Sequence, residues 1–168
     1  VYPFGMLTNC FDLDRHSTRR AQLVNYIYDF KNKYKSSPAA CPSESELLDG
    51  WNKLQVALQW SNLYCADSVD LKLRSLGFGT TPPLRLTSEQ IELMAEVEHN
   101  RWNMEKLLLG YRKPTPEEEE KCKDNAVRKE YKTKRFVHTD IRPYYQLDEG
   151  TKEYDRCISE CLPLIAEQ

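Results

Sequence analysis

Apolar residues recur at helical spacing along most of this chain. The first stripe has intervals of 4, 3 and 4 residues, as expected for one face of an α-helix. Its members are Leu23, Ile27, Phe30 and Tyr34. The pattern predicts a first helix over about 18–35 and further helices over about 58–76 and 151–165. We therefore expect a mainly α fold.

Start and stop signals mark further helix boundaries. A capping box, a Ser or Thr followed three residues later by Glu or Gln, is typical of a helix N-terminus. Such pairs begin at Ser43, Thr87 and Thr115. Gly77 and Gly110 are placed to end helices, because glycine readily adopts the left-handed conformation found after many helix C-termini. The signals therefore predict a long helix over about 87–109, ended by Gly110.

The remaining patterns indicate little β-structure and one internal boundary. Stretches 1–7 and 136–141 could pair as minor strands. A connector over 77–88 is rich in Gly and Pro, the residues that most often separate elements. This connector divides the chain into two units, which we place at 1–79 and 84–168.

An internal repeat relates the two units. A shift of 74 residues aligns Ala21 with Ala95, Asn25 with His99, and Tyr28 with Trp102. Further along, a shift of 93 places Asn62 on Asp155, so the second copy is longer between its helices by the charged segment 113–135. Each copy has two main helices, too few to bury its apolar face alone. We expect the copies to pack with pseudo-twofold symmetry into one compact unit.

The helix over 87–109 carries apolar residues on two faces when its positions are placed at about 100° per residue. One face holds Leu93, Val97, Met104, Leu107 and Leu108. The opposite face holds Ile91, Ala95, His99, Trp102 and Leu109. Glu98, Arg101 and Glu105 lie on a polar seam between them. We expect the first face to pack within its own repeat and the second to meet the other repeat.

The second face contains the candidate ligand site. Under pseudo-twofold symmetry, Tyr28 and Trp102 would face each other across a groove between the repeats. Two aromatic rings can stack on both faces of a planar ligand ring. The flanking candidates are Asn25, His99 and Arg101, with Tyr144 and His138 as further members. In the alternative interpretation, Tyr28 and Trp102 pack at the interface, with His99 hydrogen-bonded there.

Composition excludes several classes of protein. The net charge of −2 argues against a general nucleic-acid binder. The content of 40% hydrophobic and 30% charged residues is that of a soluble globular protein. No apolar run approaches the roughly 18 residues that span a bilayer, and the first residues lack a signal-peptide pattern. We therefore expect a cytoplasmic protein. The start at Val1 indicates a piece of a longer chain, whose other domains would be partners.

The chain shows no pattern typical of a catalytic or metal site. Its six cysteines form no CxxC pair, and only Cys157 and Cys161 lie close together in sequence. His138 and Asp140 could support acid–base chemistry. However, the sequence contains neither a nucleophile motif nor a glycine-rich phosphate loop. We expect reduced thiols, no metal, no cofactor and no enzymatic activity.

The strongest basic cluster lies within the segment 121–135. It could meet phosphates or nucleic acid. Four glutamates precede it, and acidic residues before basic ones suit the dipole of a solvated helix, which is the favoured interpretation. In a narrower version of the ligand hypothesis, Lys134 or Arg135 reaches a ligand phosphate near His138.

Two stretches of the second unit resemble the RyR domain, the repeat named for the ryanodine receptors and found also in bacterial proteins. The first stretch carries His99, Trp102, Gly110 and Tyr111. The second carries His138, Asp140, Pro143, Tyr144 and Leu147, followed by Lys152, Glu153, Asp155 and Arg156. The first unit looks like a degenerate copy in which Asn25 and Tyr28 replace His and Trp. Thr139 also departs from the family pattern, which has Pro there.

The resemblance implies tandem RyR-type repeats, each of two main helices with loops. In bacterial relatives such repeats often follow a TrkA-type nucleotide-binding domain or occur in proteins suspected of ligand sensing. The resemblance therefore implies a non-catalytic, ligand-sensing module. Combined with the two aromatic residues, it favours an adenine-type nucleotide as the small-molecule ligand. The alternative is a protein–protein docking or structural repeat domain of a larger protein.

Overall fold

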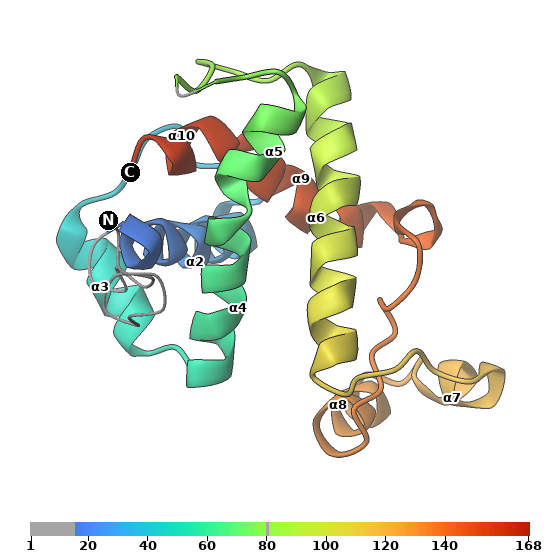
Figure 1. The fold of residues 1–168 in the computed structure, drawn as a ribbon. Helices are drawn as coiled ribbons and strands as arrows, with labels where there is room; N and C mark the ends of the chain where they lie inside the picture. The colour runs from blue at the N-terminus through green and yellow to red at the C-terminus, as the bar shows by residue number, and fades with distance from the viewer. Residues whose placement is uncertain (1–15, 80) are drawn as a thin grey trace, which may run out of the picture.

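The computed structural model describes residues 16–79 and 81–168 of the chain (Figure 1). These residues fold into α-helices joined by loops, which confirms the mainly α prediction. Across the described ranges, the only β-structure is an isolated parallel bridge between Arg112 and Val137. The stretch 136–141 is therefore not a strand, and the stretch 1–7 lies outside the described residues. No helix in these ranges is both long and apolar enough to cross a bilayer.

The helices divide the chain more finely than the apolar pattern predicts. In chain order they are α2 (His16–Tyr34), α3 (Glu44–Asn52), α4 (Val56–Asp67), α5 (Val69–Ser75), α6 (Ser88–Leu108), α7 (Pro116–Lys121), α8 (Asn125–Lys134), the 3-10 turn η1 (Tyr144–Gln146), α9 (Glu149–Glu160) and α10 (Leu162–Ala166).

The predicted capping boxes and glycine stops are confirmed. At the start of α6, the Gln90 backbone N–H donates to the Thr87 hydroxyl, and the Thr87 N–H donates to the Gln90 side chain. Capping boxes also begin α3 and α7. Gly77 and Gly110 have φ angles of 88° and 84°, the left-handed conformation that allows the chain to leave a helix.

Two helices predicted as continuous are each broken in the structure. The prediction over 58–76 becomes α4 and α5, separated at Ser68, whose hydroxyl donates to the Cys65 carbonyl. The prediction over 151–165 becomes α9 and α10, separated at Cys161. Pro163 explains the second break, because it has no N–H to donate back along the helix. The charged segment also forms two helices, and Asp124 caps the second of them.

The helices pack as two groups, and α9 contacts both of them. Helix α2 packs against α3 and α4, while α6 packs against α9. Helix α9 also contacts α2, and α10 contacts α5 (Figure 1). The main core lies where these helices meet. Its fully buried aliphatic side chains are Leu23, Val24, Ile27, Val69, Ile158, Leu162 and Ile165.

The expectation that the first apolar face of α6 packs within its own repeat is wrong. This face, from Leu93 to Leu108, is exposed: 52% of Leu93 and 81% of Leu108 are accessible to solvent. The seam containing Glu98 and Glu105 is buried instead. Its burial is possible because cationic side chains from within the protein neutralise both carboxylates.

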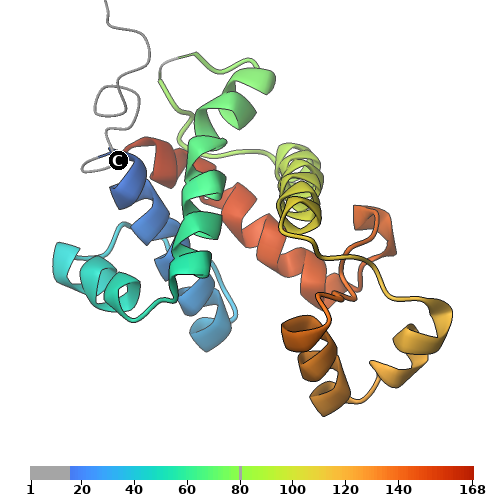
Figure 2. The ribbon, with the colours of Figure 1, turned by 60° about the horizontal axis from the view of Figure 1, so that its bottom comes forward.

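Helices α7 and α8 form a small lobe beside the α6–α9 pair (Figure 2). The lobe has its own core, made by Cys122, Tyr131 and Val137 with Val127 against them. Backbone hydrogen bonds from Arg112 to the Phe136 carbonyl and from His138 to the Arg112 carbonyl close its base. These bonds fix the position of His138 relative to the end of α6.

Candidate functional site

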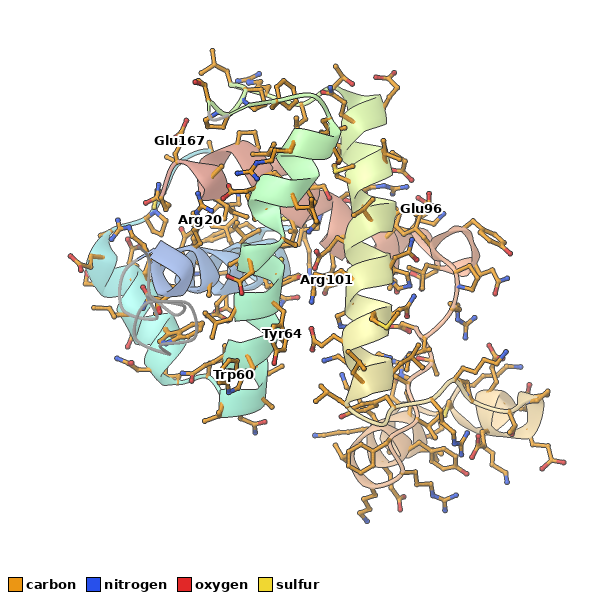
Figure 3. The ribbon with its side chains drawn as sticks, in the orientation of Figure 1. Arg20, Trp60, Tyr64, Glu96, Arg101 and Glu167 are labelled. Carbon is orange, nitrogen blue, oxygen red and sulfur yellow. The ribbon has the colours of Figure 1, made fainter. Side chains whose placement is uncertain are left out.

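A buried network of charges joins α6 to α4 and α5. Glu98 is completely buried, and Lys72 of α5 and Arg101 both donate to its carboxylate. Arg101 also donates to Glu105 at 2.8 Å, and the Ser61 hydroxyl of α4 donates to Glu105 at 3.0 Å. In Figure 3, Arg101 lies in the space between α4 and α6. The network therefore occupies the interface between the predicted repeats.

The electrostatics of this network are self-contained. Burial by itself would raise the pKa of Glu98, but Lys72 and Arg101 outweigh it and lower the pKa to about 2. The pKa of Arg101 is raised for the corresponding reason: Glu98 and Glu105 outweigh its desolvation. Arg101 was predicted to contact a ligand, but its charge is already balanced by two carboxylates.

His99 is held by acceptors on both ring nitrogens. Its Nδ1 lies 3.2 Å from the Asp155 carboxylate, and its Nε2 lies 2.9 Å from the Arg142 carbonyl oxygen. Neither partner can donate, so both contacts are satisfied when both nitrogens carry protons. Burial opposes protonation, but Asp155 outweighs it and raises the pKa of His99 above its ordinary value.

Four of the predicted site residues are joined through ring contacts. The His99 ring stacks with Trp102 at a centroid distance of 5.7 Å and lies 6.0 Å from the Tyr144 ring. The His138 ring meets Trp102 edge-on at 4.8 Å. The Lys106 ammonium lies 5.7 Å from the Trp102 ring centre. Trp102 is half-buried and lies at the centre of this aromatic cluster.

The two candidates from the first unit lie on α2 and do not join this cluster. Tyr28 packs against the main core, and Asn25 is buried with its amide 3.4 Å from Asp29. Within the described ranges, no ring contact connects Tyr28 with Trp102. The pKa of Tyr28 is raised well above its ordinary value by burial, with Cys65 and Glu98 adding to the effect. The charges of Glu98 and Arg101 therefore act on the Tyr28 hydroxyl, in opposite directions.

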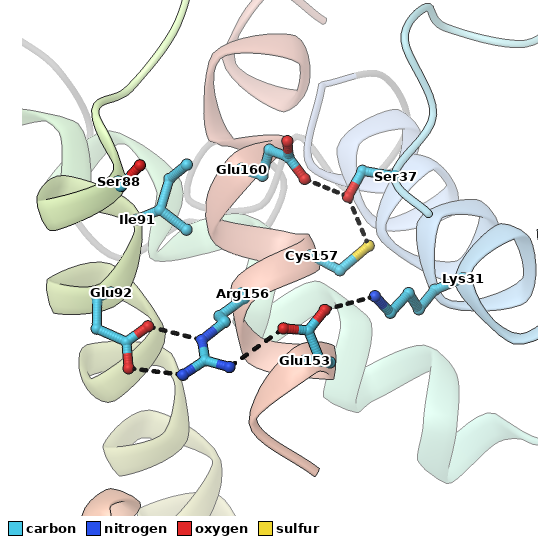
Figure 4. Close-up of a pocket in the computed structure, with 9 residues that line it drawn as sticks. All are labelled: Lys31, Ser37, Ser88, Ile91, Glu92, Glu153, Arg156, Cys157 and Glu160. Atoms are coloured by element: carbon cyan, nitrogen blue, oxygen red, sulfur yellow. Dashed lines mark hydrogen bonds and ion pairs between the residues drawn. The ribbon is translucent and has the colours of Figure 1, made fainter. Parts of the chain in front are cut away.

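A cavity of about 370 Å³ lies between α2, α6 and α9 (Figure 4). The charged side chains in it are largely paired with one another. Arg156 donates to Glu92 at 2.6 Å and to Glu153 at 3.1 Å, while Lys31 donates to Glu153 at 2.8 Å. The ion pairs across this cavity leave little free charge for a ligand.

A second cavity, of about 470 Å³, lies between α8, the loop 137–140 and the beginning of α9. Arg128, Lys129 and Lys132 of α8 line one wall, and His138 lines another. Sequence reasoning missed these three cations as site residues, because it assigned the whole basic cluster to a solvated helix. It named Lys134 and Arg135 instead. Lys134 pairs with Glu130, and Arg135 lies over the Tyr131 ring.

Lys72 was also missed by sequence reasoning, since no pattern links it to α6. Glu98, Arg101 and Glu105 share one side of a helix, which is the only signal that could have indicated a buried ion network.

Among the described residues, no group of three or more His, Cys, Asp or Glu side chains is arranged to hold a metal ion. Comparison with protein-family models, curated proteins and solved structures gave no match to this chain.

Proposed function

We propose that this chain is a non-catalytic, ligand-sensing module of RyR type that binds an adenine-type nucleotide within unit 84–168, where the Trp102 ring meets His138. The groove expected between the two units is filled by the ion network of Lys72, Glu98 and Arg101. One observation carries the proposal. The His138 ring both contacts Trp102 and lines the cationic cavity of α8. An aromatic surface for a base therefore adjoins a positively charged cavity, and a nucleotide combines a planar ring with an anionic group.

The pattern of helix contacts supports two related units. The alignment shifts of 74 and 93 relate the pair α2–α4 to the pair α6–α9, and both pairs are in close contact. Polar links between the pairs also correspond. The link from Lys31 to Glu153 aligns, within one residue, with the link from Glu105 to Ser61. This correspondence supports the pseudo-twofold arrangement that the internal repeat predicts.

The residue roles in the proposal follow from the contacts. Trp102 provides the stacking surface, worth about 1–3 kcal/mol for a base, and His99 holds Trp102 in place through its ring contact. Tyr144 supports His99. Tyr28 and Asn25 lie on α2 outside the aromatic cluster and have no contact role in this proposal. Arg101 maintains the interface rather than contacting phosphate. We further propose that the chain is part of a longer cytoplasmic protein whose neighbouring domains respond to the ligand.

A thermal-shift screen with adenine and guanine nucleotides, including cyclic forms, tests the proposal. A ligand that binds only the native state raises the unfolding temperature in a dose-dependent manner. We expect a rise with adenine nucleotides in the wild-type chain and in Trp102→Phe, and its loss in Trp102→Ala that retains native circular dichroism. No rise at millimolar nucleotide in the wild-type chain would exclude this function.

A second candidate function is protein–protein docking, and the exposed apolar face of α6 favours it. Leu93, Met104 and Leu108 are exposed along one face of α6, which Asn100 interrupts, whereas surface apolar residues are usually scattered. The partner would be a domain with a complementary apolar surface. We expect the isolated chain to self-associate with rising concentration in analytical ultracentrifugation. The double variant Met104→Gln and Leu108→Gln should remain monomeric.

Leu71 on α5 provides a matched control for this experiment. It is 71% exposed but lies off the α6 stripe. Leu71→Gln should associate like the wild-type chain. Equal behaviour of all three proteins would remove the support for docking through α6.

A further inference from the structure

We propose that the cavity between α8 and the loop 137–140 is a phosphate-binding site, in which Arg128, Lys129 and Lys132 bind the phosphate groups of the nucleotide. The inference rests on the proposed function, because it assigns the anionic end of the same ligand. Nothing in the sequence pattern separates these three cations from the other basic residues of the segment. The fold distinguishes them, because it places all three at one cavity.

The position of α8 directs the three cations toward the cavity. Val127 and Tyr131 anchor a neighbouring side of the helix, about 100° away, in the small core with Val137. Arg128 and Lys132 are four residues apart, so they project from one face of α8. Because α8 is anchored by its apolar side, a ligand can meet a preformed row of cations.

These cations are not neutralised within the protein. Throughout the part of the chain that the structure describes, Arg128, Lys129 and Lys132 have no carboxylate within ion-pairing distance. Other basic side chains nearby are already engaged: Lys123 pairs with Glu120, for example, at 2.6 Å. Partial burial lowers the pKa of Lys132, and the neighbouring cations Lys106 and Arg128 lower it further, while Asp140 opposes them. A bound anion would relieve this repulsion.

Two carboxylates also line the cavity, and both have other contacts. Asp148 caps α9 by accepting hydrogen bonds from the backbone N–H and the hydroxyl of Thr151. Asp140 accepts from the Thr139 hydroxyl at 2.9 Å and lies 3.8 Å from His138 Nδ1. Three cations against two carboxylates leave a net positive charge in the cavity. A phosphate group that carries two or more negative charges is suited to this balance.

His138 connects the cavity to the stacking surface. The Asp140 backbone N–H donates to His138 Nδ1 at 3.2 Å, so Nε2 carries the proton of the neutral ring. Burial lowers the pKa of His138 to about 4, and the cations Lys132 and Lys106 contribute to the lowering while Asp140 opposes it. At neutral pH the ring is therefore an uncharged donor between Trp102 and the cationic wall.

Calorimetric titrations of the full chain with ATP, adenosine and inorganic tripolyphosphate test the site. We expect Lys132→Gln to weaken ATP binding about tenfold, the size of effect expected when one hydrogen bond to a charged group is lost. Adenosine binding should be unchanged. Asp140→Asn, which removes a negative charge from the cavity, should strengthen ATP binding. Lys121→Gln, which removes an exposed cation outside the cavity, is the matched control and should bind like the wild-type chain.

The outcomes separate the site from the proposed function. If ATP and adenosine bind equally and Lys132→Gln has no effect, the phosphate site is wrong while nucleotide binding stands. If tripolyphosphate binds and is lost in Lys132→Gln but adenosine does not bind, the site holds and the nucleotide function fails. If neither ATP nor tripolyphosphate binds the wild-type chain, both are overturned. Near-native unfolding temperatures are expected for Lys132→Gln and Lys121→Gln, because both side chains are exposed.

Discussion

Glu98 is completely buried, yet its low pKa keeps it ionised, because Lys72 and Arg101 both donate to its carboxylate. Desolvating three charges is unfavourable, and only their mutual attraction offsets it. Removing Glu98 leaves Lys72 buried without a counter-charge and leaves Arg101 with Glu105 alone. The network therefore links α6 to α5 through the Glu98 carboxylate, while Glu105 links α6 to Ser61 of α4.

Glu98→Gln should destabilise the chain by about 3–5 kcal/mol, because Lys72 and Arg101 would lose a buried counter-charge. Chemical denaturation followed by circular dichroism measures the change. Glu96→Gln is the control, since Glu96 is exposed on the same helix (Figure 3), and we expect it to change stability by less than about 0.5 kcal/mol. Equal stabilities of the two variants would show that the network does not hold the interface.

The same carboxylate predicts a dependence on acid. The pKa of Glu98 lies at about 2 in the folded chain, below its ordinary value of 4.5. Its stabilising effect is therefore complete above the ordinary value and is lost as the pH falls from there toward 2. Glu98→Gln should lack this part of the acid dependence.

His99 makes a prediction of the opposite sign. Because Asp155 raises the pKa of His99 above 6.5, the stabilisation from this pair is complete below that value and is lost as the pH rises through the folded-state pKa. Nuclear magnetic resonance titration of the imidazole should show the raised pKa, and Asp155→Asn should lower it. His138 serves as an internal control, because burial and not Asp155 sets its low pKa of about 4. An unchanged His99 pKa in Asp155→Asn would contradict the assigned contact.

Helix starts and stops were the features that local sequence predicted best. Thr87 with Gln90, and Gly110 after the helix, act through hydrogen bonds and backbone angles within a few residues. The breaks at Ser68 and Cys161 were missed, although Pro163 gave a local signal for the second. Ser68 has no comparable signal, since serine is also tolerated inside helices.

The two faces of α6 show why periodicity alone assigned the wrong face of this helix to the core. Apolar spacing identified the stripe from Leu93 to Leu108, but spacing does not say whether a stripe meets core, solvent or a partner. Glu98 and Glu105 were placed on a polar seam from their helical angle, and carboxylates are rarely buried without counter-charges. Their partner Lys72 lies on another helix and becomes visible only in the folded chain.

Across the whole molecule, the sequence predicted part of the candidate site. His99, Trp102, Tyr144 and His138 were named from one helix face and from the resemblance to RyR repeats, and the fold brings their rings together. The cationic cavity was not predicted, because it forms only when α8 packs beside the loop 137–140. Long-range placement of this kind leaves no local pattern.

Titration calorimetry of ATP against the wild-type chain, Trp102→Phe and Trp102→Ala is the most direct test of the central claim. We predict saturable binding to the wild-type chain and to Trp102→Phe, with affinity reduced about tenfold or more in folded Trp102→Ala, because the base loses its stacking surface. Equal affinity in all three proteins, or no heat of binding in the wild-type chain at millimolar ATP, would contradict nucleotide binding beside Trp102.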